Sequence, residues 1–188
     1  MKNIAIIAIM TVLAVLMGCI SQQQPLPKEY TFSDGLSELQ AIETKYDLGK
    51  NTTSMDNFDL GRLEIISLES KFESYNETND IAALKSLTEF RLSYLNVQKS
   101  AKTGLDMIGD VETNCSNNKT ISDALVYINY AIDNATISSQ KFQEFKSDYP
   151  EYLAKTNINS SFDVFILQIS SNLNDSANQV RTQLQGCI

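Results

Sequence analysis

The sequence predicts an all-α protein, folded as an up-down antiparallel bundle of about five helices. Apolar residues recur at spacings of three and four along several long segments, as they do on one face of an α-helix. No segment shows the sustained alternation of apolar and polar residues that is typical of strands. None of the three prolines lies between residues 28 and 149, so that span is free to form long helices. With 188 residues, 43% hydrophobic and 20% charged, the chain has the composition of one folded domain.

The chain begins with a short leader that is typical of exported proteins. Lys2 supplies a positive start, and about 14 almost uninterrupted apolar residues follow, too few to span a bilayer but suited to a signal peptide. The leader ends in Leu16-Met17-Gly18-Cys19, which resembles the lipobox of prokaryotic lipoproteins. The resemblance implies that residues 1–18 are removed and that Cys19 carries a lipid. A plain signal peptide with an incidental cysteine is the alternative.

Residues 19–30 have the composition of a polar tether. A run of glutamines ends at Gln24 and is followed by Pro25 and Pro27, and polar segments with proline act as spacers. The chain carries 15 basic and 23 acidic residues, a net charge of -8. Because an anionic membrane surface repels such a protein, the lipid must hold it there. We therefore expect residues 31–188 to form a helical domain at the extracytoplasmic face of the cell membrane.

Two helices are predicted at the start of this domain, over about residues 33–48 and 57–75. Each has its apolar side chains on one face, which predicts that this face packs against other helices. The two faces consist of Leu36, Leu39, Ile42 and Tyr46 in the first helix and of Ile65, Leu68, Phe72 and Tyr75 in the second.

The third predicted helix, over about residues 79–111, has the clearest pattern. Its apolar residues alternate spacings of three and four through successive heptads, which is typical of a helix that packs lengthwise along another. These residues are Leu87, Phe90, Tyr94, Val97, Ala101, Gly104 and Ile108.

The last two helices are predicted over about residues 121–148 and 161–185. Short connections between successive helices favour antiparallel neighbours. The apolar stripes are Leu125, Ile128, Ile132, Ala135, Ser139 and Phe142 in the fourth helix, and Phe162, Ile166, Ile169, Leu173, Ala177, Val180 and Leu184 in the fifth.

Three of these helices have a start signal in the sequence. A hydroxyl residue accepts a hydrogen bond from the first turn, and an acidic residue three positions later complements the helix dipole. The pairs are Thr31 with Asp34, Thr120 with Asp123 and Ser160 with Asp163.

Cys115 and Cys187 are predicted to form a disulfide. They are the two thiols that remain once Cys19 is lipidated, and disulfides persist in exported proteins. In an up-down bundle, the third and fifth helices end at the same side, and one cysteine follows each of them. The alternative is a pair of free thiols.

Asparagines in the sequence pattern of N-glycosylation are numerous, and most of them lie in predicted loops. One interpretation is an N-glycosylated surface protein, which beside a lipobox suggests an archaeal source. The other is that Asn, Ser and Thr all favour loops. The candidates are Asn51, Asn76, Asn114, Asn118, Asn134, Asn159 and Asn174.

The composition excludes several classes of function. Without histidine, the chain has no His-ligated metal site and no Ser-His-Asp or Cys-His nucleophile system. An acidic protein with a pI of about 4.5 is unsuited to binding nucleic acid. No pair of carboxylates stands out for acid–base catalysis. We expect no metal, no cofactor and no enzymatic activity.

We expect the protein to bind a protein partner or to act as a scaffold at the cell surface. The alternative is a bundle that binds a small molecule or lipid in an aromatic-lined pocket of its interior. The aromatic residues available for such a pocket are Tyr94, Tyr127, Tyr130, Phe142, Phe145 and Phe162.

Overall fold

The computed structural model describes residues 29–50, 52–109 and 117–185, and within these residues it contains six helices and no strand. The prediction of an all-α helical bundle is therefore confirmed. The helices are α2 (Phe32–Lys45), α3 (Met55–Glu73), α4 (Asn79–Gly109), α5 (Asn118–Asp148), α6 (Pro150–Leu153) and α7 (Phe162–Gln185). The short α6 was not predicted. It occupies part of the connection expected between residues 148 and 161. It begins at Pro150, and proline is tolerated in the first turn of a helix because the N–H groups there have no partner within the helix.

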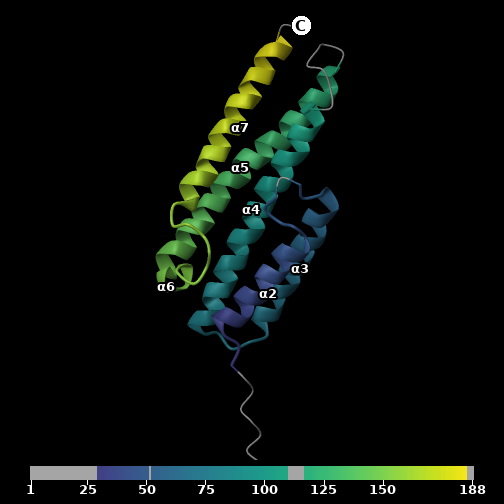
Figure 1. The fold of residues 1–188 in the computed structure, drawn as a ribbon. Coiled ribbons are helices and arrows are strands. Elements are labelled where there is room, and N and C mark those ends of the chain that lie inside the picture. Colours follow the sequence, from purple (N-terminus) through teal and green to yellow (C-terminus); the bar gives the residue numbers. More distant parts are fainter. Residues whose placement is uncertain (1–28, 51, 110–116, 186–188) are drawn as a thin grey trace, which may run out of the picture.

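The two longest helices, α4 and α5, form the axis of the bundle (Figure 1). Each has 31 residues and is therefore about 46 Å long. They run in opposite directions, because Phe90 lies against Phe142 near one end and Gly104 lies against Ile128 near the other. We call the end where α2 begins the proximal end and the end where α7 ends the distal end.

The remaining helices pack on different parts of this axis (Figure 1). α2 and α3 contact α4, and α7 contacts α5. Every described residue of the five predicted apolar faces is buried or half-buried. The larger core cluster draws on all six helices, with Phe72, Leu84 and Phe90 fully buried. The distal cluster around Ile128 and Leu173 is built from α4, α5 and α7.

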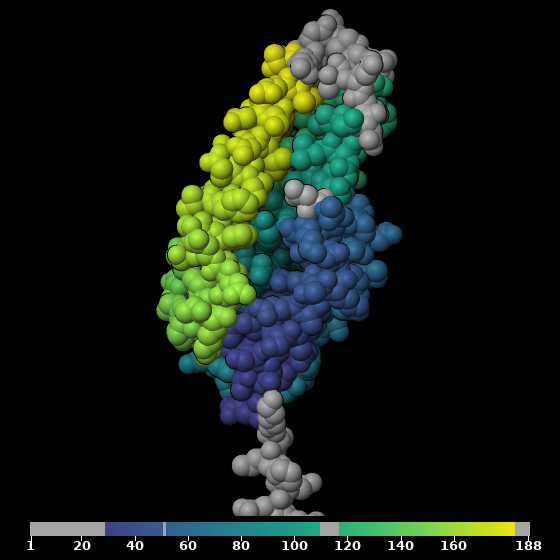
Figure 2. Space-filling model, viewed as in Figure 1, coloured from purple at the N-terminus to yellow at the C-terminus, as the bar shows by residue number. Residues whose placement is uncertain are grey.

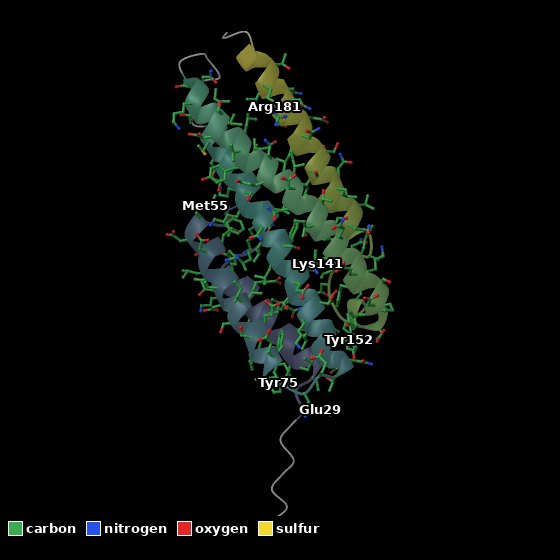
Figure 3. The ribbon with its side chains drawn as sticks, turned by 180° about the vertical axis from the view of Figure 1, so that it is seen from behind. Glu29, Met55, Tyr75, Lys141, Tyr152 and Arg181 are labelled. Atoms are coloured by element: carbon green, nitrogen blue, oxygen red, sulfur yellow. The ribbon has the colours of Figure 1, made fainter. Side chains whose placement is uncertain are left out.

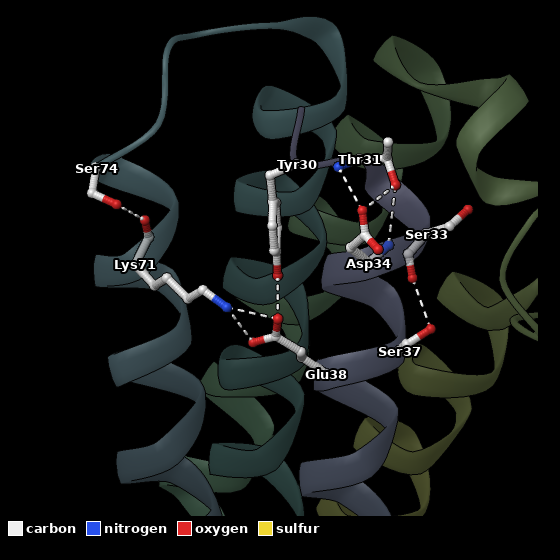
Figure 4. A network of polar contacts seen from close by, with 8 residues as sticks. All are labelled: Tyr30, Thr31, Ser33, Asp34, Ser37, Glu38, Lys71 and Ser74. Carbon is white, nitrogen blue, oxygen red and sulfur yellow. Dashed lines mark hydrogen bonds and ion pairs between the residues drawn. The ribbon is translucent and has the colours of Figure 1, made fainter. Parts of the chain in front are cut away.

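The first of the predicted helix starts is confirmed at α2. Thr31 Oγ1 accepts a hydrogen bond from Asp34 N–H at 3.3 Å, and Asp34 Oδ2 accepts one from Thr31 N–H at 3.1 Å (Figure 4). Just before this cap, the Tyr30 hydroxyl donates to Glu38, which also receives two hydrogen bonds from Lys71 of α3. The start of the domain is thus fixed both within α2 and to its neighbour.

The predicted cap at Thr120 is wrong, because α5 begins at Asn118 and Thr120 lies inside the helix. α7 begins at Phe162, close to the predicted start at residue 161. At α7, the Asp163 side chain is buried and its Oδ2 accepts a hydrogen bond from Gln143 of α5 at 3.3 Å. Packing between the two helices therefore determines the position of this acid.

Asp80, at the start of α4, connects three helices. Its Oδ2 accepts a hydrogen bond from the Phe32 N–H of α2 at 2.7 Å, and its Oδ1 accepts one from the Tyr152 hydroxyl of α6 at 2.6 Å. Tyr152 lies near the proximal end of the molecule (Figure 3). The two bonds hold α2 and α6 on either side of the α4 start.

Candidate functional site

The six aromatic residues expected for an interior pocket do not meet around a common space. Phe142 and Phe145 are fully buried. Phe142 packs against Phe162 with ring centres 5.9 Å apart, and Phe162 packs against Tyr94 at 5.1 Å. These rings fill the core.

The two remaining tyrosines of that set lie on the surface. Tyr127 is 41% exposed and Tyr130 55% exposed on α5. The helical period explains this position: Leu125 and Ile128 turn toward the core, so residues 127 and 130 turn away from it.

A long surface groove is present instead (Figure 2). In Figure 2 it is the hollow between the purple and blue surface of α2 and α3 and the yellow-green surface of α7, with teal atoms of α4 at its bottom. It comprises two clefts of about 460 and 510 Å³ and a smaller one of about 190 Å³. The small cleft shares Glu43 and Arg91 with the first and Tyr94 and Gln98 with the second, so the three are continuous.

The floor of the groove is one face of α4. Arg91, Tyr94, Gln98, Ala101 and Leu105 follow one another at spacings of three and four, so they lie on successive turns of the same face. This face is adjacent to the predicted core stripe and shares Tyr94 and Ala101 with it. Arg91 and Gln98 were not among the predicted site residues, although they lie seven positions apart on either side of Tyr94.

The turn between α2 and α3 builds one wall of the groove. Asp47 has φ 52° and Gly49 has φ 86°, and these left-handed conformations end α2 earlier than predicted. Leu48 packs on α3 at Gly61, where a Cβ would lie 2.8 Å from a Leu48 methyl carbon. Gly49 and Lys50 consequently line the groove.

An ion pair between α2 and α4 occupies the middle of the groove. Arg91 Nε lies 3.0 Å from Glu43 Oε1, and both side chains are about three-quarters buried, with 24% and 23% exposed. The angle at this contact is not that of a hydrogen bond, and Arg91 Nε has no hydrogen-bond partner among the described residues. Burial raises the pKa of Glu43, and the charge of Arg91 opposes that shift.

Two neutral polar side chains follow Arg91 along α4. Tyr94 and Gln98 line the small cleft and share a side-chain hydrogen bond. Burial raises the pKa of Tyr94, while the Arg91 charge and the bond to Gln98 lower it. The net direction is upward, so the phenol stays protonated at neutral pH.

Toward the distal end, the groove becomes apolar. Leu105 is 46% exposed and Phe165 52% exposed, and both line the larger cleft together with Ile169. Lys102 lies beside them, but its charge is paired with Asp106 at 3.0 Å. A ligand in this part of the groove would meet mainly hydrocarbon.

The predicted modification sites have different environments. Cys19, Cys115, Cys187, Asn51 and Asn114 lie outside the described residues.

The described asparagines of the glycosylation pattern are divided between helices and connections. Asn118, Asn134 and Asn174 lie in helices, and Asn134 donates a hydrogen bond to the Tyr130 carbonyl at 2.7 Å. Asn76 and Asn159 lie between helices. A connection presents an asparagine side chain more openly than the middle of a helix does.

Two general features of the described residues bear on function. No three His, Cys, Asp or Glu side chains among them gather where they could hold a metal ion. None of the described helices combines the length and the apolar character needed to cross a membrane.

The comparisons with known proteins assign no function to this groove. Comparison with protein-family models, with curated proteins and with solved structures gave no match to this chain.

Proposed function

We propose that the chain is a lipid-anchored protein of the extracytoplasmic face of the cell membrane, which binds a ligand in the groove above α4 and catalyses no reaction. The observation that carries the binding role is the combination of exposed Leu105 and Phe165 with the largely buried pair Arg91 and Glu43 in one continuous groove. Apolar walls with a few polar groups are typical of ligand sites.

The anchor is supported by the leader and by the tether that precedes α2. Replacing Cys19 with serine removes the thiol on which the lipid would be placed. We expect Cys19→Ser to leave the protein unprocessed or released from the membrane, whereas the natural chain incorporates labelled fatty acid or isoprenoid precursor. Membrane fractionation and label incorporation measure this. Unchanged labelling of the serine variant would contradict the anchor.

Binding in the groove is tested with a photo-crosslinking residue at position 105. The matched control is position 63, because Leu63 is 60% exposed on α3 and lines none of the clefts of the groove. In cells of the source organism, irradiation should give a defined adduct at position 105 and none at position 63. Equal adducts at both positions, or none at 105, would exclude the groove as the binding site.

The non-catalytic role is supported by the state of the acidic side chains in the groove. Glu43 is paired with Arg91, and Asp106 is paired with Lys102. The two acids lie on different helices, Glu43 on α2 in the middle of the groove and Asp106 on α4 in its distal cleft. They are therefore not arranged as the neighbouring acid and base that proton-transfer catalysis uses.

Docking of a protein partner is a second candidate role, favoured by the outer face of α5. Val126, Tyr127, Tyr130 and Ile137 form an exposed apolar stripe there. Exposed aromatic residues are typical of protein interfaces. If a protein partner binds this face, Tyr130→Ser should abolish its co-purification, whereas Leu63→Ser on α3 should not.

The disulfide between Cys115 and Cys187 and the N-glycans belong to the same proposal. Both modifications are typical of exported proteins. For the glycans, peptide mass spectrometry of the protein from its source decides between the two interpretations of the asparagine pattern.

A further inference from the structure

The middle of the groove is lined by three side chains that carry hydrogen-bond donors, Arg91, Tyr94 and Gln98. A guanidinium carries five N–H donors. Arg91 makes its closest contact with Glu43 through Nε, at 3.0 Å, and no described residue forms a hydrogen bond with its two terminal amino groups. Arg91 lines two of the three clefts. One turn further along α4, Tyr94 adds a hydroxyl and Gln98 an amide to the same small cleft.

These donors lie at one end of a track that becomes apolar toward the distal end. From Tyr94 the floor continues through Gln98 and Ala101 to Leu105, which along an α-helix is about 16 Å. Lys102 and Asp106 line the same cleft as an ion pair. Phe165 lies over the far part of this track, on the α7 side. The hydrocarbon core of a bilayer is about 30 Å thick, so the acyl chains of one leaflet span about 15 Å of it. The track is about as long as this depth.

From this arrangement we infer that the groove binds a single-chain amphiphile with a carboxylate head, such as a long-chain fatty acid. The carboxylate lies at Arg91, and the chain lies along α4 toward Leu105. A planar guanidinium binds a carboxylate through paired N–H donors, and burial of the chain removes the exposed apolar surface of Leu105 and Phe165 from water. This inference rests on the proposed binding role of the groove.

The charge of the head group determines whether each of two substitutions strengthens or weakens ligand binding. Glu43 faces Arg91 and repels a bound carboxylate. Glu43→Gln should therefore tighten binding of the acid, and Arg91→Met should weaken it by about tenfold or more, the value of a charge-assisted hydrogen bond. A cationic amphiphile would show the opposite signs.

The test uses the full chain in nanodiscs of a neutral lipid and a palmitic acid that carries a diazirine near the end of its chain. After irradiation, mapping of the labelled peptides should place the adducts at residues 101–105 and 165–169. Unlabelled palmitic acid should compete with the probe, and its methyl ester, which lacks the negative charge, should not. Lys141→Met is the matched control, because Lys141 pairs with Glu89 and Glu144 outside the groove (Figure 3). This variant should be labelled like the natural chain.

Three results would overturn the inference: labelling of other segments, equal competition by the methyl ester, or unchanged labelling of Arg91→Met. If circular dichroism shows that Arg91→Met does not fold, the affinity of Glu43→Gln and the competition by the methyl ester still test the inference. The crosslinker at position 105 separates this inference from the proposed function. An adduct there without fatty-acid labelling rejects the fatty acid and keeps the groove, whereas no adduct and no labelling reject both.

Discussion

At the scale of single residues, Asp80 joins α4 to two other helices through hydrogen bonds at the proximal end. It accepts from the Phe32 N–H of α2 and from the Tyr152 hydroxyl of α6. The hydrogen bond from Tyr152 is the main cause that lowers the pKa of Asp80, and the same bond raises the pKa of Tyr152 to about 12. The ionised carboxylate is therefore the form that stabilises the fold.

Asp80→Asn should lower the free energy of unfolding by about 1–3 kcal/mol at pH 7, because the amide loses the charge and has only one acceptor oxygen. The pKa of Asp80 in the folded state lies below its ordinary value of 3.8, so its contribution is full above about pH 4 and disappears as the pH falls through the folded-state pKa. Urea unfolding at several pH values measures this.

The control for this experiment is Asp133→Asn on the exposed side of α5. We expect no comparable loss there. A difference between the natural chain and Asp80→Asn that stays constant down to pH 2 would contradict the assigned role of the carboxylate.

At the scale of elements, the contact between α4 and α5 depends on a glycine. A Cβ at Gly104 would lie 2.9 Å from the Ala124 carbonyl oxygen and 2.7 Å from a side-chain carbon of Ile128. The carbonyl belongs to the backbone of α5 and cannot turn away. The predicted stripe of α4 includes Gly104, and the structure explains why a residue without a side chain lies there.

Gly104→Ala should destabilise the protein by about 1–3 kcal/mol, because α4 and α5 must separate to accommodate the methyl group. Gly109→Ala is the matched control on the same helix, since no atom of another described helix lies within 4 Å of its Cβ position. The control should be neutral or slightly stabilising, because alanine favours the helix. Thermal unfolding distinguishes the two. Equal stability of both variants would show that the helices do not approach so closely.

At the scale of the whole molecule, the distal end brings together helix ends that are far apart in sequence. The described ends of α4 and α7 and the start of α5 all lie there (Figure 1). Arg181 of α7 donates to Asn129 of α5 at 2.7 Å, which joins these two helices near that end. The helix ends that flank Cys115 and Cys187 in sequence thus lie on the same side of the molecule.

The disulfide between Cys115 and Cys187 remains a prediction of the sequence. In an exported protein we expect non-reducing digestion to give two peptides joined by the disulfide, one with Cys115 and one with Cys187. Closing a loop of this length should stabilise the fold by about 4 kcal/mol. Peptide mapping with and without reductant measures the bond, and unfolding with and without reductant measures its energy. Alkylation of both thiols without reductant would exclude it.

The buried faces of the helices can be predicted from the sequence alone. The spacing of apolar residues predicted that Leu87, Phe90 and Val97 lie in the core, and they do. It also predicted the cap formed by Thr31 and Asp34. These features are local, because the helical period and the first turn of a helix involve residues that are close in the chain.

Where an open surface remains depends on how the helices pack against one another. Arg91 and Glu43 meet because α2 ends at a left-handed turn and packs against α4. Phe165 faces the groove because α7 packs along α5 and leaves this side of α4 uncovered. Periodicity shows that a helix has an apolar face, but the pairing of faces depends on all the helices at once. The groove therefore follows from packing between elements distant in sequence, which no local pattern contains.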